Sequence, residues 1–205
     1  MKKPIVKMID TSVFCDHEKF NEAYALVSEE RKKKIDSLLF DEDKRLSLGA
    51  GVLFEEGLKS FGIGDGTLVY GKHKKPYLAS QGNLFFSLSH SGVYSACAFY
   101  DKEIGIDIQK VKDVTDAVIK KVATDKEYAL LSSLDEKAGA EEFTRLWTVK
   151  ESYLKFLGTG LSVSPQKIEV TFGENITLFC DGTLADVVFE EHSKDGYKTT
   201  VCYAK

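Results

Sequence analysis

The chain has 205 residues, 43% of them hydrophobic, which is enough to bury the core of one large domain or two small ones. Charged residues make up 29% of the chain and the formal net charge is −4, so its overall charge does not favour nucleic acid as a partner. No stretch is apolar enough for a membrane span or a signal peptide, and none of the four cysteines belongs to a Cys-x-x-Cys pair. We therefore expect a cytoplasmic protein that binds neither nucleic acid nor membranes.

The first part of the chain is predicted to be mainly helical. A short strand is expected at residues 4–9. Apolar residues at helical spacing then predict helices over residues 17–27, 28–39 and 41–60. Ser28 is the expected N-cap of the second of these helices, because two glutamates follow it directly.

The periodicity then changes to that of strands. Strands are expected at residues 68–70, 84–88, 93–100 and 104–109. The last three, joined by tight turns, predict an antiparallel meander that brings His90, Asp107 and Gln109 to one edge of a sheet. Since side chains alternate along a strand, Asp107 and Gln109 should share the face opposite the neighbouring isoleucines.

The second part of the chain repeats the progression from helices to strands. Helices are expected over residues 115–134, as one or two segments, and over residues 138–157, followed by a glycine-rich stop. Four further strands are expected at residues 167–172, 176–179, 184–190 and 197–203. Each half of the chain thus combines helices with a sheet, and a boundary is expected near residue 102.

Three short segments carry groups that suit phosphate chemistry. They are Phe86-Ser-Leu-Ser-His-Ser91, Gly105-Ile-Asp-Ile-Gln109 and Trp147-Thr-Val-Lys-Glu-Ser-Tyr-Leu-Lys155. Mg²⁺ prefers one or two carboxylates together with phosphate oxygens, and Asp107 with Glu151 meets that count. Lysines beside such a cation neutralise phosphate oxygens during phosphoryl-type transfer.

Each segment also has an ordinary structural explanation. Asp107 fits a strand with one wet face, and His90 fits a plain turn. Glu151 and Lys155 are spaced as a helix-stabilising pair worth roughly 0.2–0.5 kcal/mol. A serine–histidine hydrolase is a further alternative, but a Gly-x-Ser-x-Gly elbow is absent and adjacent Ser89 and His90 do not provide the geometry of a nucleophile and its base.

Taken together, the three segments resemble the motifs of the 4′-phosphopantetheinyl transferases of the longer, Sfp-like type. The Ser-His-Ser turn, the Gly-Ile-Asp-Ile strand and the Trp-x-x-Lys-Glu-Ser-x-x-Lys helix occur in that family's order, and the match covers most of the chain. The resemblance implies an α+β fold of two similar halves in a pseudo-twofold arrangement, residues 1–102 and 103–205. Coenzyme A would lie between the halves of a monomer, with its adenosine and 3′-phosphate on the side of the first.

The activity that the resemblance implies is Mg²⁺-dependent. The enzyme would move the 4′-phosphopantetheine arm of coenzyme A to a serine of an apo acyl or peptidyl carrier protein and release adenosine 3′,5′-bisphosphate. Asp107, Glu151 and Lys155 would form the catalytic set, with Glu151 as general base and Lys155 at the leaving phosphate. Asp107, Gln109 and Glu151 would hold the metal, and Gln109 stands where many relatives have Glu.

The resemblance also implies a set of contacts to coenzyme A. The residues implied are Arg45, Lys75, Ser89, His90, Lys150 and Lys155. Ser89 would face the adenosine and the others the phosphates, with Arg31 and Lys34 as looser additions. The alternative is a non-catalytic module that binds coenzyme A or a carrier protein. Such a module could dispense with Glu151 and Lys155, and because both are present we favour the enzyme.

Overall fold

The computed structural model describes residues 3–80 and 83–205, and it confirms the expected α+β class. In the first half, the helices are α1 (His17–Leu26), α2 (Glu29–Asp36) and α3 (Asp41–Ser60), and the strands are β1 (Ile5–Asp10), β2 (Leu68–Tyr70), β3 (Pro76–Leu78), β4 (Phe85–Ser91) and β5 (Tyr94–Tyr100). In the second half, the helices are α4 (Asp116–Val122), α5 (Asp125–Ser132) and α6 (Glu136–Leu157), and the strands are β6 (Ile104–Lys110), β7 (Ile168–Phe172), β8 (Ile176–Cys180), β9 (Thr183–Leu184), β10 (Val187–Lys194) and β11 (Tyr197–Ala204). Short 3-10 helices occupy Thr11–Cys15, Gly160–Ser162 and Pro165–Lys167.

The helices follow the sequence signals closely. The α3 helix has the predicted bounds, and the Ser28 hydroxyl caps α2 by accepting from the Arg31 backbone N–H at 3.3 Å. The α2 helix ends at Asp36 rather than at the predicted residue 39. Strand β3, which pairs with β2 in a hairpin, was not expected from the sequence.

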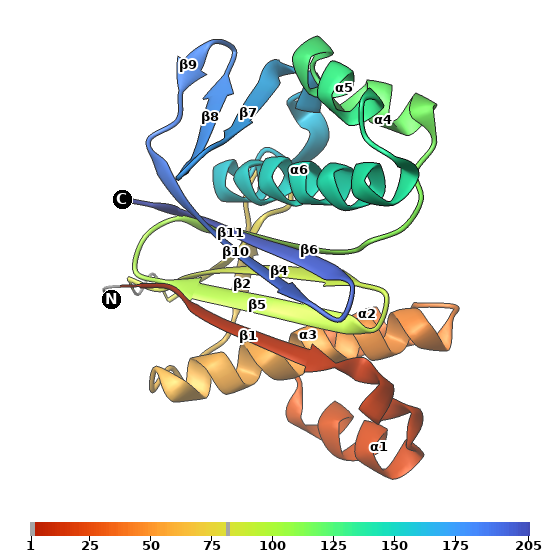
Figure 1. The fold of residues 1–205 in the computed structure, drawn as a ribbon. Coiled ribbons are helices and arrows are strands. Elements are labelled where there is room, and N and C mark those ends of the chain that lie inside the picture. Colours follow the sequence, from red (N-terminus) through yellow and green to blue (C-terminus); the bar gives the residue numbers. More distant parts are fainter. Residues whose placement is uncertain (1–2, 81–82) are drawn as a thin grey trace.

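Two antiparallel sheets form the centre of the molecule, with strand orders β1-β5-β4 and β10-β11-β6 (Figure 1). They pack face to face, because Ala96 and Ala98 of β5 share one buried cluster with Ile104, Ile106 and Ile108 of β6. The α3 helix covers the outer side of the first sheet and α6 the outer side of the second (Figure 1). In both sheets the strand that opens the half pairs with the strand that closes it, as expected for two similar halves.

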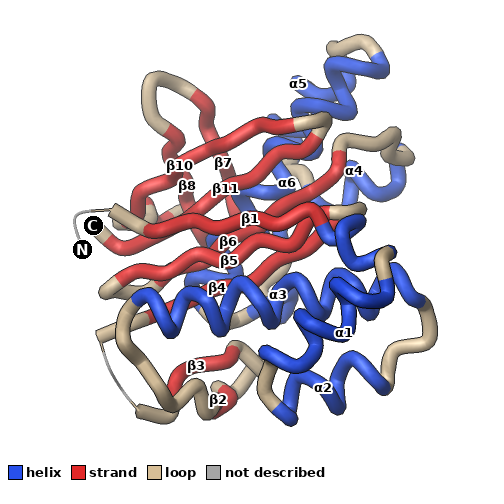
Figure 2. Tube along the Cα trace, turned by 90° about the horizontal axis from the view of Figure 1, so that it is seen from below, coloured by secondary structure: helices blue, strands red, loops and turns tan. Residues whose placement is uncertain are grey.

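The remaining elements pack around α3 on one side of the molecule and around α6 on the other. On the side of the first sheet, α1, α2 and the β2–β3 hairpin surround α3 (Figure 2). On the other side, α4, α5 and the third sheet, β7-β8-β9, lie over α6 (Figure 1). Within the described ranges, none of the helices combines the length and the apolarity that a membrane span requires.

The predicted meander is wrong at its third strand. The β5 strand pairs with β4 and β1, whereas β6 pairs with β11 and thereby opens the second sheet. Strands β4 and β6 still lie side by side, joined by serine side chains instead of a backbone ladder. The backbone N–H groups of β6 donate to serine hydroxyls of β4 in the pairs Ile106–Ser87 (3.0 Å), Ile108–Ser89 (3.3 Å) and Lys110–Ser91 (3.1 Å). The strands therefore run parallel along this seam, and strand periodicity alone did not reveal the partner of β6.

Candidate active site

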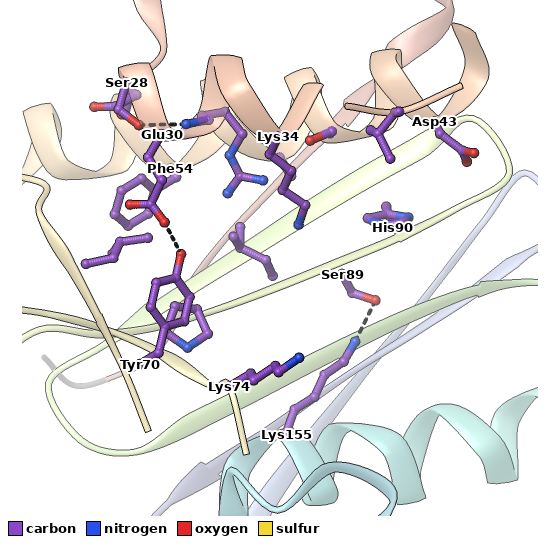
Figure 3. Close-up of a pocket in the computed structure, with 18 of the residues that line it drawn as sticks. Ser28, Glu30, Lys34, Asp43, Phe54, Tyr70, Lys74, Ser89, His90 and Lys155 are labelled. Carbon is purple, nitrogen blue, oxygen red and sulfur yellow. Dashed lines mark hydrogen bonds between the residues drawn. The ribbon is translucent and has the colours of Figure 1, made fainter. Parts of the chain in front are cut away.

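A pocket of about 570 Å³ opens at the seam between the two sheets. Its walls come from α2 and α3 on one side and from β4, β6 and α6 on the other, as Figure 3 shows for many of its residues. The residues of this pocket that bear on the chemistry are Arg31, Lys34, Asp43, Lys74, Ser89, His90, Asp107, Gln109, Glu151 and Lys155. The expectation that His90, Asp107 and Gln109 come together is confirmed, although the neighbour of β6 in its sheet is β11.

Asp107 lies at the floor of the pocket and is only 1% exposed. Its Oδ1 atom accepts hydrogen bonds from Lys155 Nζ at 2.7 Å and from Ser89 Oγ at 2.7 Å. Its Oδ2 atom accepts one from Gln109 Nε2 at 3.1 Å. The explanation of Asp107 as a residue on a wet strand face is therefore wrong, because this carboxylate is buried and bonded on both oxygens.

Gly105 allows α6 to pass close enough to reach Asp107. A Cβ atom at this position would lie 2.0 Å from the Ser152 carbonyl oxygen and 2.4 Å from the Phe156 backbone nitrogen, which real contacts do not allow. Because Glu151 and Lys155 flank this contact on α6, the missing side chain of Gly105 determines how near they come to β6.

One carboxylate oxygen of Glu151 lacks a hydrogen-bond partner among the described residues. Its Oε2 atom is buried and accepts no hydrogen bond from the described residues. Burial raises the pKa of this carboxyl, nearby Lys155 opposes that rise, and the neighbouring Asp107 adds to it. Trp147, one turn earlier, packs against the core under the third sheet rather than in the pocket.

Cations of α2 line the pocket together with His90 of β4, and the carboxylates of Glu30, Asp43 and Glu55 lie among them. His90 stands at the mouth of the pocket, whose walls desolvate its imidazole and lower its pKa; Lys155 and Lys34 lower that pKa further. Burial, followed by repulsion from Arg31, lowers the pKa of Lys34. Arg31, Lys34 and Lys155 thus bring positive charge into the pocket, where it suits phosphate oxygens.

Lys75 and Lys150, for which the resemblance implies phosphate contacts, are both hydrogen-bonded within the chain. Lys75 Nζ donates to Glu103 Oε2 at 2.7 Å and to the backbone oxygens of Ile104 and Phe156. Lys150 is fully buried, and its Nζ donates to Glu127 Oε2 at 2.6 Å and to two backbone oxygens. Each ammonium has three hydrogens, so these contacts use all of them. Both lysines connect elements of the fold and do not line the main pocket, while Lys75 lines the adjoining groove beside Pro76.

Arg45 and Ser89 also depart from the expected roles. Arg45 lines a separate pocket of about 270 Å³ beside Phe14 and Cys15, whereas Arg31 and Lys34, the looser candidates, line the main pocket. The Ser89 hydroxyl donates its single hydrogen to Asp107 and accepts from Lys155 at 2.8 Å (Figure 3), which leaves no donor for an adenosine contact. These bonds also remove the hydrolase reading, since the hydroxyl is bound to a carboxylate rather than to a histidine.

A cation of the main pocket was missed by the sequence analysis. Lys74 points into it from the β2–β3 turn (Figure 3), where its backbone is left-handed with φ 65°. The sequence offered only the basic cluster around His73, which fits a solvated surface equally well. A left-handed lysine carries no sequence signal, because that conformation usually belongs to Gly or Asn.

The donor set at the pocket floor fits a hard divalent cation. The described residues contain no cluster of three His, Cys, Asp or Glu side chains at metal-binding distance. They do place the carboxylates of Asp107 and Glu151 and the amide of Gln109 on one pocket. The unpartnered Glu151 Oε2 is the kind of buried atom that a cation satisfies, and Mg²⁺ typically uses one or two carboxylates plus substrate oxygens.

Comparisons with known proteins identify the family of the chain. Residues 103–202 match the sequence model of a family described as the 4′-phosphopantetheinyl transferase superfamily. A 4′-phosphopantetheinyl transferase of Bacillus subtilis is 30% identical over 186 residues, covering 88% of this chain and 83% of that protein. The human L-aminoadipate-semialdehyde dehydrogenase-phosphopantetheinyl transferase is 32% identical over 109 residues, covering 46% of this chain and 35% of that protein. A holo-(acyl-carrier-protein) synthase of Bacillus anthracis, solved in complex with CoA (3′,5′-ADP), aligns with 50% of this chain and 96% of its own at 22% identity and a TM-score of 0.42.

Proposed function

Because the chain belongs to the 4′-phosphopantetheinyl transferase superfamily, we propose that it transfers the phosphopantetheine arm of coenzyme A to a serine of an apo carrier protein in a Mg²⁺-dependent reaction. The by-product is adenosine 3′,5′-bisphosphate. The observation that carries this proposal is the convergence of Asp107, Glu151 and Lys155 in one pocket that Arg31, Lys34 and Lys74 also line. A module that only bound coenzyme A would not need a buried carboxylate without a partner.

Asp107 and Glu151 would hold the Mg²⁺. The amide of Gln109 now donates its NH₂ group to Asp107, so a turn of this amide is needed before its oxygen becomes a ligand. The cation supplies neutralisation of the diphosphate oxygens when it is bound. Burial of Asp107 keeps competing water away from the carboxylate, which strengthens its interaction with any cation at the pocket floor.

Glu151 would accept the proton of the carrier serine as its oxygen attacks the phosphorus next to pantetheine. Its raised pKa makes it a stronger proton acceptor than an exposed carboxylate, which suits a general base. The serine oxygen–phosphorus bond forms as the bond from that phosphorus to the bridging oxygen breaks. Lys155 then stabilises the negative charge on the phosphate of the departing adenosine bisphosphate.

The cations of the pocket would orient coenzyme A. Arg31, Lys34, Lys74 and His90 would contact its phosphates, because they line the same pocket as the proposed metal ligands. The first half, residues 1–102, would thus bind the adenosine and 3′-phosphate, and residues 103–205 would supply the metal ligands and the catalytic helix. Apolar wall residues such as Phe54 and Leu88 offer surface for the adenine.

A smaller groove of about 200 Å³ continues beyond Lys155 and would take the pantetheine arm. Pro76, Leu88 and Lys155 line both spaces, so a chain leaving the diphosphate can pass from one to the other. Phe86 and Leu154 make this groove more apolar than the main pocket, which suits a largely uncharged arm.

The test is incubation with coenzyme A, Mg²⁺ and a panel of apo fatty-acid, polyketide and nonribosomal-peptide carriers, followed by intact mass analysis. One phosphopantetheine group should be added to at least one carrier, and only when Mg²⁺ and the acceptor serine are both present. Binding of coenzyme A without mass gain on any carrier would leave the non-catalytic module as the better explanation. We further propose that the enzyme acts in the cytoplasm as a monomer, which size-exclusion chromatography with light scattering tests for the oligomeric state.

A further inference from the structure

Lys155 has two roles in the proposed site. In the structure its Nζ atom is bonded to Asp107 Oδ1 at 2.7 Å and to Ser89 Oγ at 2.8 Å, so it is the counter-ion of the buried carboxylate (Figure 3 shows the Ser89 contact). The proposed reaction needs the same ammonium on a phosphate and the same carboxylate on a cation. A cation that takes Oδ1 of Asp107 displaces Lys155, and one ion pair is then exchanged for two new ones.

We propose that the Lys155–Asp107 ion pair couples the binding of the divalent cation to the binding of the diphosphate. Without a diphosphate, Lys155 occupies the position on Asp107 that a metal would use, and metal affinity is low. A diphosphate in the pocket attracts Lys155 and uncovers Oδ1. By linkage, the cation must then strengthen diphosphate binding by the same factor. This inference rests on the proposed function, because that function supplies the two ligands.

The surroundings of the ion pair support this exchange. Asp107 is 1% exposed, so its charge requires a partner at all times. The Lys155 side chain is 26% exposed and lines both the main pocket and the apolar groove, so it has room to turn away from β6. Gln109 covers the other oxygen of Asp107 with its NH₂ group at 3.1 Å, a contact that a glutamate at this position could not make. Both oxygens of the carboxylate are thus covered by groups of the chain itself.

The experiment measures Mn²⁺ binding by the loss of the free-ion EPR signal, with no carrier protein present. Lys155→Met should bind Mn²⁺ about tenfold more tightly than the wild type, because the competing ammonium is gone. Lys155→Arg should stay close to the wild type, since a guanidinium can still pair with Asp107. Lys34→Met is the matched control: it removes a cation from the same pocket without touching Asp107 and should change Mn²⁺ affinity less than threefold.

The second arm repeats the titrations with coenzyme A. Coenzyme A should tighten Mn²⁺ binding by a larger factor in the wild type than in Lys155→Met, because only the wild type has an ion pair to exchange. Lys155→Gln replaces the methionine variant if circular dichroism shows that the latter is unfolded. Equal Mn²⁺ affinity in the wild type and the neutral variants would overturn the coupling while leaving the transferase proposal intact. If no carrier is modified but the Lys155 dependence is found, the transferase proposal is the one that fails.

Discussion

Gly105 of β6 and Ser152 of α6 approach each other so closely that a Cβ on Gly105 would lie 2.0 Å from the Ser152 carbonyl oxygen. This contact joins the strand that carries Asp107 to the helix that carries Glu151 and Lys155. The geometry of the candidate site therefore depends on a residue that has no side chain.

Gly105→Ala should damage activity more than stability. The new methyl group pushes α6 away from β6, and a misplacement of about 1 Å is expected to lower kcat/KM by roughly 100-fold. The control is Gly139→Ala, also on α6, whose added Cβ would meet only the Leu131 oxygen at 3.8 Å. That change should leave kcat/KM unaltered and stabilise the helix by about 0.5–1 kcal/mol. Equal activity of both variants would show that the close approach does not position the site.

The metal assignment predicts opposite outcomes at two neighbouring positions of β6. Asp107→Ala should abolish phosphopantetheine transfer, because it removes a proposed metal ligand and leaves Lys155 without its partner. Gln109→Glu should retain transfer, since a carboxylate is the better ligand for Mg²⁺. Single-turnover transfer monitored by intact mass compares the three proteins. Equal rates in all of them would remove the metal assignment.

Glu151→Gln should stabilise the metal-free protein at neutral pH while it abolishes transfer. Burial is the chief cause of the raised pKa of Glu151 in the folded state. The protonated carboxyl therefore favours folding fully at pH values below the unfolded-state pKa. This contribution to stability is lost as the pH rises through the folded-state pKa. Removing the ionised, unpartnered oxygen should raise the free energy of unfolding by roughly 1–3 kcal/mol near pH 7.5. Urea unfolding in EDTA should show a much smaller difference in the free energy of unfolding between Glu151→Gln and the wild type near pH 4. A constant gap at both pH values would contradict the electrostatic origin.

The arginines of α2 and α3 should differ in their effect on coenzyme A. Arg31→Ala should raise the KM for coenzyme A about 10- to 100-fold, as expected for one or two lost charge-assisted hydrogen bonds, and should alter kcat less. Arg45→Ala should change this KM less than threefold, because Arg45 lines a separate pocket. Steady-state kinetics with a single carrier distinguish the two. A larger effect at Arg45 would restore the role that the family resemblance implied for it.

Lys150 should matter for folding rather than for substrate binding. Lys150→Met leaves Glu127 buried without its cation and should lower the free energy of unfolding by about 3–5 kcal/mol. Adding Glu127→Gln to this variant should recover part of the loss, because the uncompensated charge is then removed. Where Lys150→Met is folded, its KM for coenzyme A should lie within about twofold of the wild type. A strong rise of this KM in stable protein would return Lys150 to the phosphate site.

The sequence predicted most of the local structure. Helical spacing predicted α1, α3 and α6, and Ser28 marked the start of α2. Alternation along β6 predicted the shared face of Asp107 and Gln109, because such signals depend on neighbours within a few residues. The motif order also identified the family, which the comparisons confirm.

Only the tertiary structure decided which cations serve the pocket and which serve the fold. Lys75 and Lys150 resemble Arg31 and Lys34 as sequence, yet the first two bond to acceptors of the fold and the second two face the pocket. The same holds for the partner of β6 and for the Lys155–Asp107 pair, whose members are 48 positions apart. The reason is physical: a charged side chain is bound by whatever group lies within hydrogen-bonding distance, and for these residues that group comes from a distant part of the chain.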